Sequence, residues 1–149
     1  MDIRLANICI TVHQRETPES KSYWDGNFLV VTVPYQDAKN NIKGHGPYLH
    51  LLELSMFLEA CEKLHKTLHG KAILDPWVPC IRIELIGSIY GGVQLQTSFS
   101  PDLGFVKQNI EFLDEIDQSN MPDLISSLRQ VLDEYPIDVE SLATKAIGK

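Results

Sequence analysis

The spacing of apolar residues changes along this chain, and the changes limit the folds that it can adopt. Residues 54–68 and 121–135 repeat apolar side chains every three or four positions, as amphipathic helices do. Strand-like patterns, mostly with a period of two, occupy residues 7–13, 28–33, 71–75, 80–86, 93–99 and 105–116. The order predicts an α+β domain, β-β-α-β-β-β-β-α, with a mainly antiparallel sheet of about six strands and both amphipathic helices on one face.

The two helical segments also carry signals for their ends. Gly70 is suited to a left-handed residue after the first helix, and Pro136 stops the second, which Ser119 or Asn120 can cap. We therefore expect one domain over residues 1–136 and a weakly structured tail over 137–149. The apolar stripe of the first helix consists of Leu54, Phe57, Leu58, Cys61, Leu64, His65 and Leu68. That of the second consists of Met121, Leu124, Ile125, Leu128, Val131, Leu132 and Tyr135.

Between the second strand and the first helix lies a polar stretch, residues 34–47, which contains Gly44 and Gly46. Its composition predicts a long loop, and loops of that length are often functional. Within it, GHGPYL has two glycines of a dinucleotide fingerprint but Leu49 where the third belongs. It also follows a polar stretch rather than a strand, so we interpret it as a turn. The strand segment 105–116 alternates imperfectly, which predicts a bulge or an edge position.

The net charge of −7 is unevenly distributed. Residues 102–140 hold ten acids against the two bases Lys107 and Arg129. The charge argues against direct binding of nucleic acid, which needs Lys and Arg to neutralise phosphates. It would attract a cationic protein, although a solvated face explains it equally well. The acids are Asp102, Glu111, Asp114, Glu115, Asp117, Asp123, Asp133, Glu134, Asp138 and Glu140.

The chain shows no apolar run long enough for a membrane span and no signal peptide, so we expect no membrane association. Its three cysteines, Cys9, Cys61 and Cys80, are odd in number and far apart, which favours a reduced, cytoplasmic protein.

The strongest candidate for chemistry is HKTLH, in which His65 and His69 have the helical spacing of zinc ligands and Cys61 lies one turn earlier. The metalloprotease pattern needs Glu after the first His, and Lys66 stands there. No nucleophile elbow or phosphate loop occurs. We therefore expect no enzyme, no bound metal and no cofactor. A small metal-binding protein or enzyme using these three residues remains the alternative.

The stretch SYWDGNFLVV places Asp25-Gly26-Asn27 directly before an apolar strand. We interpret it as the bent start of that strand, where Gly26 permits a turn or bulge and Trp24 packs. Trp77, near Pro76 and Pro79, has the same simplest interpretation, a side chain that closes one end of the core. If Tyr23, Trp24 and Trp77 are exposed instead, they are candidate anchors for a partner.

The motifs YWDGNFLVVTV, then YLHLLELSMFLEACEKLHKTLHGKAILDPWVPCIRIELIG, then DQSNMPDLISSLRQVL together resemble the WapI-type family of bacterial immunity proteins, over about residues 20–135. The chain departs from the family pattern in lacking a polar cap at Leu51-Leu52 and in having Asp75 where Glu is usual. The matching positions are Tyr23, Trp24, Asp25, Gly26, Asn27, Leu68, Gly70, Asp75, Pro76, Asp117, Gln118, Met121, Pro122 and Leu124.

The resemblance implies a non-enzymatic protein that binds the C-terminal domain of a cognate toxin, since the family's type member neutralises a secreted tRNA-cleaving toxin in this way. Nuclease domains are often basic, so an acidic surface suits such a partner. The candidate contact residues are Glu111, Asp114, Glu115, Asp117, Trp24 and Trp77. A scaffolding domain, dimerising through the apolar strand FLVVTV, is the other alternative.

Overall fold

The structure is a computed structural model that describes residues 1–36, 41–88, 90–100, 102–103, 106–107 and 109–138. It contains two four-stranded antiparallel sheets. The first has the order β1-β2-β3-β4, with β1 (Asp2–Leu5), β2 (Ile8–Arg15), β3 (Phe28–Gln36) and β4 (Asn41–His50). The second has the order β10-β7-β6-β5, with β5 (Lys71–Leu74), β6 (Ile81–Gly87), β7 (Gly92–Phe99) and β10 (Ile110–Asp117).

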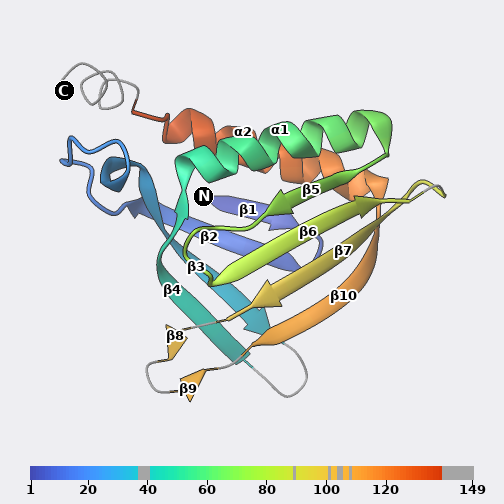
Figure 1. Ribbon diagram of the computed structural model, residues 1–149, viewed down its shortest axis with the longest axis horizontal. Coiled ribbons are helices and arrows are strands. Elements are labelled where there is room, and N and C mark those ends of the chain that lie inside the picture. Colours follow the sequence, from blue (N-terminus) through green and yellow to red (C-terminus); the bar gives the residue numbers. More distant parts are fainter. Residues whose placement is uncertain (37–40, 89, 101, 104–105, 108, 139–149) are drawn as a thin grey trace.

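Two helices join the sheets. Helix α1 (Leu51–Thr67) packs against edge strand β5, helix α2 (Met121–Glu134) packs against edge strand β1, and the helices pack against each other. Figure 1 shows both helices side by side along the top of the molecule, above the two sheets. The remaining elements are short: η1 (Asp25–Asn27), η2 (Gln118–Asn120) and the strand pair β8 (Asp102–Leu103) and β9 (Val106–Lys107).

A continuous hydrophobic core connects the inner faces of both sheets with the apolar stripes of the helices. Strand β3 supplies Leu29, Val31 and Val33, each at most 2 % exposed. Helix α2 buries Met121, Leu124, Leu128 and Val131 completely. Alternate residues of a strand point to opposite faces of its sheet. The residues that alternate with the core positions of a strand therefore face away from the core.

The α+β class, the antiparallel pairing and the predicted order of elements are confirmed. The strands of the two large sheets number eight rather than about six, because β1 and β4 carry no clear strand pattern in the sequence. For the predicted strand 105–116, the edge position is confirmed over residues 110–116, which lie in β10, since β10 pairs with β7 alone in the second sheet. Residues 106–107 belong instead to β9, which pairs with β8.

The predicted loop over residues 34–47 is wrong where the structure describes it, because most of this stretch belongs to β3 and β4. GHGPYL lies in strand β4 and is not a turn. A Cβ on Gly44 would come within 3.2 Å of the Phe99 ring and 3.4 Å of the Cys80 sulfur. Because Gly44 has no side chain, β4 can pass close to the second sheet. The same residue interrupts the alternation of apolar side chains from which a strand would be predicted.

The helix ends differ in detail from the prediction. Leu68, not Gly70, holds the left-handed position directly after α1, with φ of 56°, and its N–H donates to the Leu64 carbonyl. Gly70 follows with φ of 91°. Asn120 stands at the N-cap of α2, as predicted, although its side chain makes no capping hydrogen bond. Among the described helices, none is both long enough and apolar enough to cross a membrane.

Candidate partner-binding surface

The open edge of the second sheet carries most of the predicted contact residues. On β10, Phe112 and Ile116 lie opposite the buried Thr97 and Val93 of β7, and Asp114 lies between them opposite Leu95. These three residues therefore face the space between the sheets. The alternate residues, Glu111, Leu113 and Glu115, face away from the core opposite Ser98, Gln96 and Gln94.

Carboxylates surround an exposed apolar side chain on this outward face. Leu113 is 64 % exposed, and Glu111 and Glu115 stand on either side of it, two residues away along the strand. Among the described residues, ion pairs engage Asp2, Glu62, Asp75 and Glu84, and none engages a carboxylate of β10. The β10 edge is therefore a surface of negative potential with an apolar centre, which favours a cationic partner.

Three of the predicted contact carboxylates already make local hydrogen bonds, the longest of which, at 3.4 Å, runs from the Ser98 hydroxyl to the Oε1 atom of Glu111. Asp117 accepts a hydrogen bond of 2.8 Å from the Ser119 N–H, which caps η2 at the junction of β10 and α2. This stretch is therefore a strand end that leads into a helix cap. The Oδ1 atom of Asp114 accepts a bond of 2.8 Å from the Glu115 N–H. Asp117 therefore has a structural role, whereas Glu111 and Glu115 extend from a regular strand.

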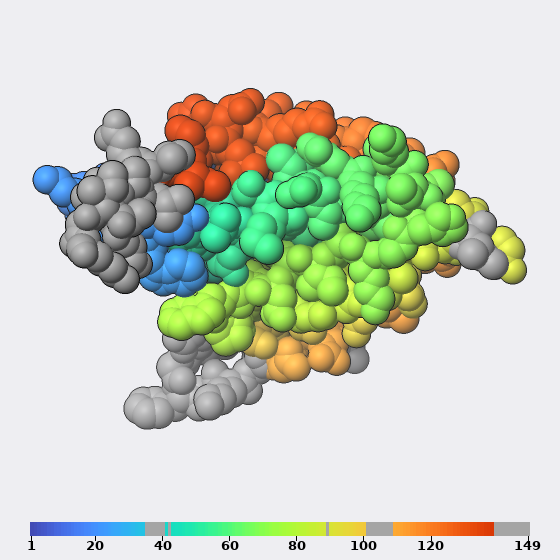
Figure 2. All heavy atoms as spheres, turned by 45° about the horizontal axis from the view of Figure 1, so that its top comes forward, coloured from blue at the N-terminus to red at the C-terminus, as the bar shows by residue number. Residues whose placement is uncertain are grey.

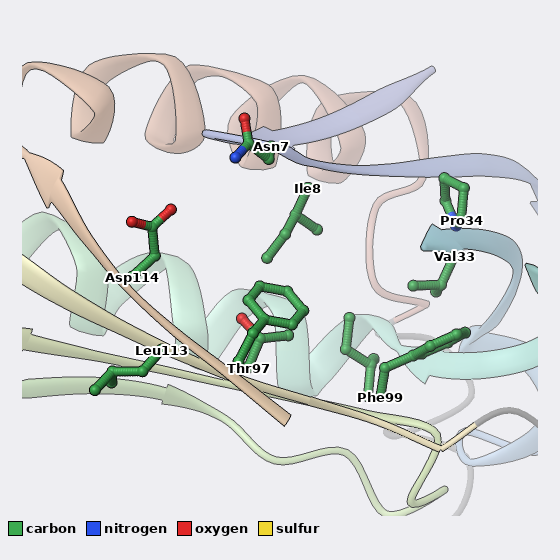
Figure 3. A pocket seen from close by; sticks show the side chains of 10 residues that line it. Asn7, Ile8, Val33, Pro34, Thr97, Phe99, Leu113 and Asp114 are labelled. Carbon is green, nitrogen blue, oxygen red and sulfur yellow. The ribbon is translucent and has the colours of Figure 1, made fainter. Parts of the chain in front are cut away.

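Beside this edge a cavity of about 300 Å³ opens between the two sheets. Figure 3 shows Asn7, Asp114 and the Thr97 hydroxyl toward one end, and Val33, Pro34 and Phe99 toward the other. The Thr97 side chain is only 2 % exposed, and its hydroxyl has no hydrogen-bond partner among the described residues. The cavity is lined by Asn7, Ile8, Val33, Pro34, Ile81, Thr97, Phe99, Phe112, Leu113 and Asp114.

No sequence motif predicts this cavity. The alternation of β7 and β10 places Thr97 and Asp114 on inward faces. Polar residues at these inward positions are the signal in the sequence that could have indicated the cavity. Asn7 and Val33 come from the other sheet, so only the packing of the two sheets brings them to the same cavity.

The predicted aromatic anchors lie in a separate cluster at the start of α1. The half-buried Trp24 ring stacks on the His50 imidazole at 4.4 Å and meets the edge of Trp77 at 5.6 Å. Trp24 thus packs, as predicted. Trp77 is 74 % exposed, so the expectation that it closes one end of the core is wrong. It covers Trp24 on one side only, because the β5–β6 loop that carries it lies outside both sheets.

A capping box holds this cluster to the helix. His50 accepts a hydrogen bond from the Leu52 N–H at its Nδ1 atom, and its Nε2 atom donates to the Trp24 carbonyl at 3.0 Å. Glu53 accepts from the His50 N–H. His50 therefore supplies the polar cap that seemed to be missing at Leu51-Leu52. Burial lowers the pKa of His50 and raises that of Glu53.

The WDGN stretch is the bent start of β3, as predicted. It forms the short turn η1, in which a Cβ on Gly26 would come within 3.0 Å of the Ser20 carbonyl oxygen. Asn27 is completely buried and donates to the Tyr23 carbonyl at 2.6 Å. Its Oδ1 atom accepts from Arg15 and from the Asp138 N–H. Gly26 and Asn27 are therefore buried and stabilise the fold, whereas Asp25 of the same motif is exposed.

The predicted contact residues therefore form two groups. Glu111, Asp114 and Glu115 lie on β10, at one edge of the second sheet, and Trp77 lies in the loop that follows β5, at the other edge. In Figure 2 the β5–β6 loop, yellow-green, protrudes beside the start of α1, and β10, orange, lies along the lower border of the molecule.

The structure does not assemble the alternative metal site. Cys61 is completely buried, and burial raises the pKa of its thiol to about 12. His65 is exposed, which contradicts its predicted place on the apolar stripe, and His69 lies beyond the end of α1 and is also exposed. Over the described part of the chain, no three His, Cys, Asp or Glu side chains are grouped to hold a metal ion.

A family of known proteins matches this chain over most of its length. The sequence model of the immunity protein WapI-like family matches residues 2–136, almost the whole chain. The match covers almost the whole α+β domain, and this chain therefore belongs to the immunity protein WapI-like family. The chain has no match among curated proteins.

Proposed function

We propose that this protein neutralises a bacterial toxin by binding the toxin's C-terminal domain one to one, in the cytoplasm of the cell that makes both proteins. Membership of an immunity protein family supports this role. The structural observation that carries the proposal is the β10 edge, where Glu111 and Glu115 flank the exposed Leu113 without an ion-pair partner among the described residues. The protein acts by binding, with no catalysis of its own.

The β10 edge suits a basic toxin domain, such as a nuclease. A nuclease needs Lys and Arg to hold a phosphate backbone, and carboxylates that cover the same groups would block its substrate. Long-range attraction would also speed the encounter, which matters because the toxin must be captured before it acts. Leu113 would supply apolar contact at the centre of the interface, where water is excluded.

Trp77 is a second candidate contact. Tryptophan is enriched among residues that dominate binding energy, and this one is 74 % exposed while its inner edge is held by Trp24. A side chain that is already oriented loses little entropy on binding. A partner large enough to reach both edges of the second sheet would contact Trp77 and β10 together.

Co-expression tests the proposal. The C-terminal domain of the protein encoded immediately upstream is produced with this chain, without it, and with a variant in which Glu111, Asp114 and Glu115 are changed to Lys. We expect the domain to be toxic alone, to be harmless with the wild-type chain, and to form a one-to-one complex on size-exclusion chromatography. The triple variant should fold but protect poorly. Toxicity that persists despite abundant, folded wild-type chain would refute the proposed pairing.

A further inference from the structure

The cavity beside β10 has an unusual combination of walls. Most of its lining is apolar, including Ile8 and Phe99, yet its polar end holds the Asp114 carboxylate, the Asn7 side chain and the buried Thr97 hydroxyl. A buried hydroxyl without a partner is rare, because the loss of its hydrogen bonds to water is not compensated. The Asp114 carboxylate is exposed and open to a group that enters from outside, whereas the Thr97 hydroxyl is sealed from solvent and can meet such a group only when neighbouring side chains move aside.

We propose that this cavity receives one lysine or arginine side chain of the toxin domain, with its cationic head at Asp114, Asn7 and Thr97 and its aliphatic stem along Ile8 and Phe99. The inference rests on the proposed function and specifies how the toxin is recognised. Lys and Arg combine a long apolar stem with a charged head, which matches the two ends of the cavity. The volume of about 300 Å³ lies at the lower limit of ligand pockets, so a single long side chain fits it.

The charge of the cavity selects the occupant. An acidic side chain would be repelled by the Asp114 carboxylate. A purely apolar one would leave the Thr97 hydroxyl without a partner and Asp114 with only its local hydrogen bond from the Glu115 N–H. A cationic head can donate to both and to the Asn7 amide oxygen. Docking would also exclude water from this group of side chains, so their contribution should appear mainly in the dissociation rate.

Asp114 has a second explanation. An inward-facing charge on an edge strand discourages pairing with a strand of another molecule. Thr97 separates the two explanations, because it lies on β7, which is paired on both sides, and has no part in protecting the edge. A variant at Thr97 thus tests the cavity without altering the open edge.

Three single variants test the proposal in the complex with the upstream-encoded domain. Thr97→Val removes the hydroxyl at nearly constant volume, Asp114→Asn removes the inward charge, and Glu59→Gln removes an exposed charge from α1, outside the proposed interface, as a control. We expect the first two to raise the dissociation rate about fivefold to tenfold and Glu59→Gln to change it less than about twofold. Equal dissociation rates for all three variants would overturn the proposal.

The toxin's own residue is found by the same measurement. Each Lys and Arg of the toxin domain is changed to Met, and each change is combined with Asp114→Asn and with Thr97→Val in double-mutant cycles. One toxin position should couple to both residues. Once that Lys or Arg is changed to Met, Asp114→Asn and Thr97→Val should have little further effect on the dissociation rate. The absence of any such position in a complex that the wild type does form would overturn the proposal.

A probe that needs no toxin separates a failure of the cavity from a failure of the immunity role. n-Butylguanidinium mimics an arginine side chain, and n-butylurea is its neutral counterpart of the same shape. We expect n-butylguanidinium to shift the methyl resonances of Ile8, Val33 and Ile81 in a saturable way, about fivefold more tightly than n-butylurea, and Asp114→Asn to abolish the difference. If the upstream domain does not bind but this difference is present, the proposed cation site in the cavity is supported and the proposed toxin partner is wrong. Equal or absent responses to the two probes overturn the cavity.

Discussion

The carboxylate of Glu53 connects the first turn of α1 to Trp77. Its Oε2 atom accepts a hydrogen bond of 2.7 Å from the Trp77 N–H, and its Oε1 atom accepts one of 3.2 Å from the His50 N–H. One side chain thus caps the helix and also holds the β5–β6 loop against it. The exposed tryptophan is therefore presented by a fixed backbone, in a loop that is also anchored by Val78, which packs against the core, and by the buried Cys80.

Replacing Glu53 with Ala should destabilise the protein and release this loop. Both hydrogen bonds would be lost and two backbone N–H groups would lack an acceptor, so we expect the free energy of unfolding to fall by about 1–2 kcal/mol. Urea unfolding followed by tryptophan fluorescence measures this loss. The control is Glu59→Ala, an exposed carboxylate on the same helix, whose effect should stay within a few tenths of a kcal/mol. Equal losses in the two variants would contradict the role of Glu53.

His50 should make the protein less stable in mild acid. Burial holds its pKa below the ordinary value of 6.5, so the unfolded chain takes up this proton at a higher pH than the folded protein does. The stability that the neutral ring contributes is complete above 6.5 and declines as the pH falls through the lowered pKa. Urea midpoints at about pH 7.5 and about pH 5.5 should therefore differ more for the wild type than for His50→Asn. His69→Asn, a change at an exposed histidine, should keep the wild-type difference.

Arg15 should be needed to keep the motif turn and the end of α2 together. Its guanidinium donates to the Gly26 carbonyl at 3.0 Å, to the Asn27 side chain at 3.1 Å and to the Pro136 carbonyl. Arg15→Met keeps the stem and removes every donor, and we expect a loss of about 1–3 kcal/mol in the free energy of unfolding. Arg4→Met is the matched control, because the Arg4 side chain is 71 % exposed. A loss no larger than that of the control would show that these bonds do not stabilise the fold.

Cys61 should not react in the folded protein. Burial, reinforced by the charge of Glu62, raises the pKa of its thiol to about 12, so the reactive thiolate is scarce at neutral pH. With iodoacetamide at about pH 8, we expect slow modification of the half-exposed Cys9 and modification of Cys61 only after unfolding. Mass spectrometry of peptides from native and urea-treated samples distinguishes the sites. Rapid modification of Cys61 in the native protein would contradict its burial.

The elements that could be predicted from the sequence are those that bury one face, because such burial requires a periodic spacing of apolar residues. The predicted stripe of α2 is complete, since all seven of its positions are core residues or pack against the core. Strand β4 carries no such pattern, because Gly44 is selected by a close approach to Phe99 that exists only once the sheets have packed. His65 shows the opposite error: spacing placed it on the stripe, but it lies at the margin, where the helix faces solvent.

The candidate site was predicted in part for the same reason. Alternation along one strand is enough to expose Glu111 and Glu115, so the charge pattern located the β10 edge. The cavity needed Ile8 and Val33 from the first sheet and Thr97 from the second, and no local pattern shows which residues of two sheets will face each other. The exposure of Trp77 likewise depends on how the β5–β6 loop lies against α1, which is a tertiary contact made through Glu53.

The outward carboxylates of β10 should control how fast the toxin domain binds rather than how long it stays. Glu111 and Glu115 are exposed and have no ion-pair partner among the described residues, so they act mainly through long-range attraction. In the double variant Glu111→Gln/Glu115→Gln, we expect the association rate at low salt to fall about fivefold and its dependence on ionic strength to flatten, with little change in the dissociation rate. Stopped-flow mixing at several salt concentrations measures both effects. The control Glu16→Gln/Glu19→Gln makes the same change in net charge at exposed positions of the loop after β2. If the control slows association as much as the β10 variant does, the net charge of the protein steers the toxin and the β10 edge has no special part in the encounter.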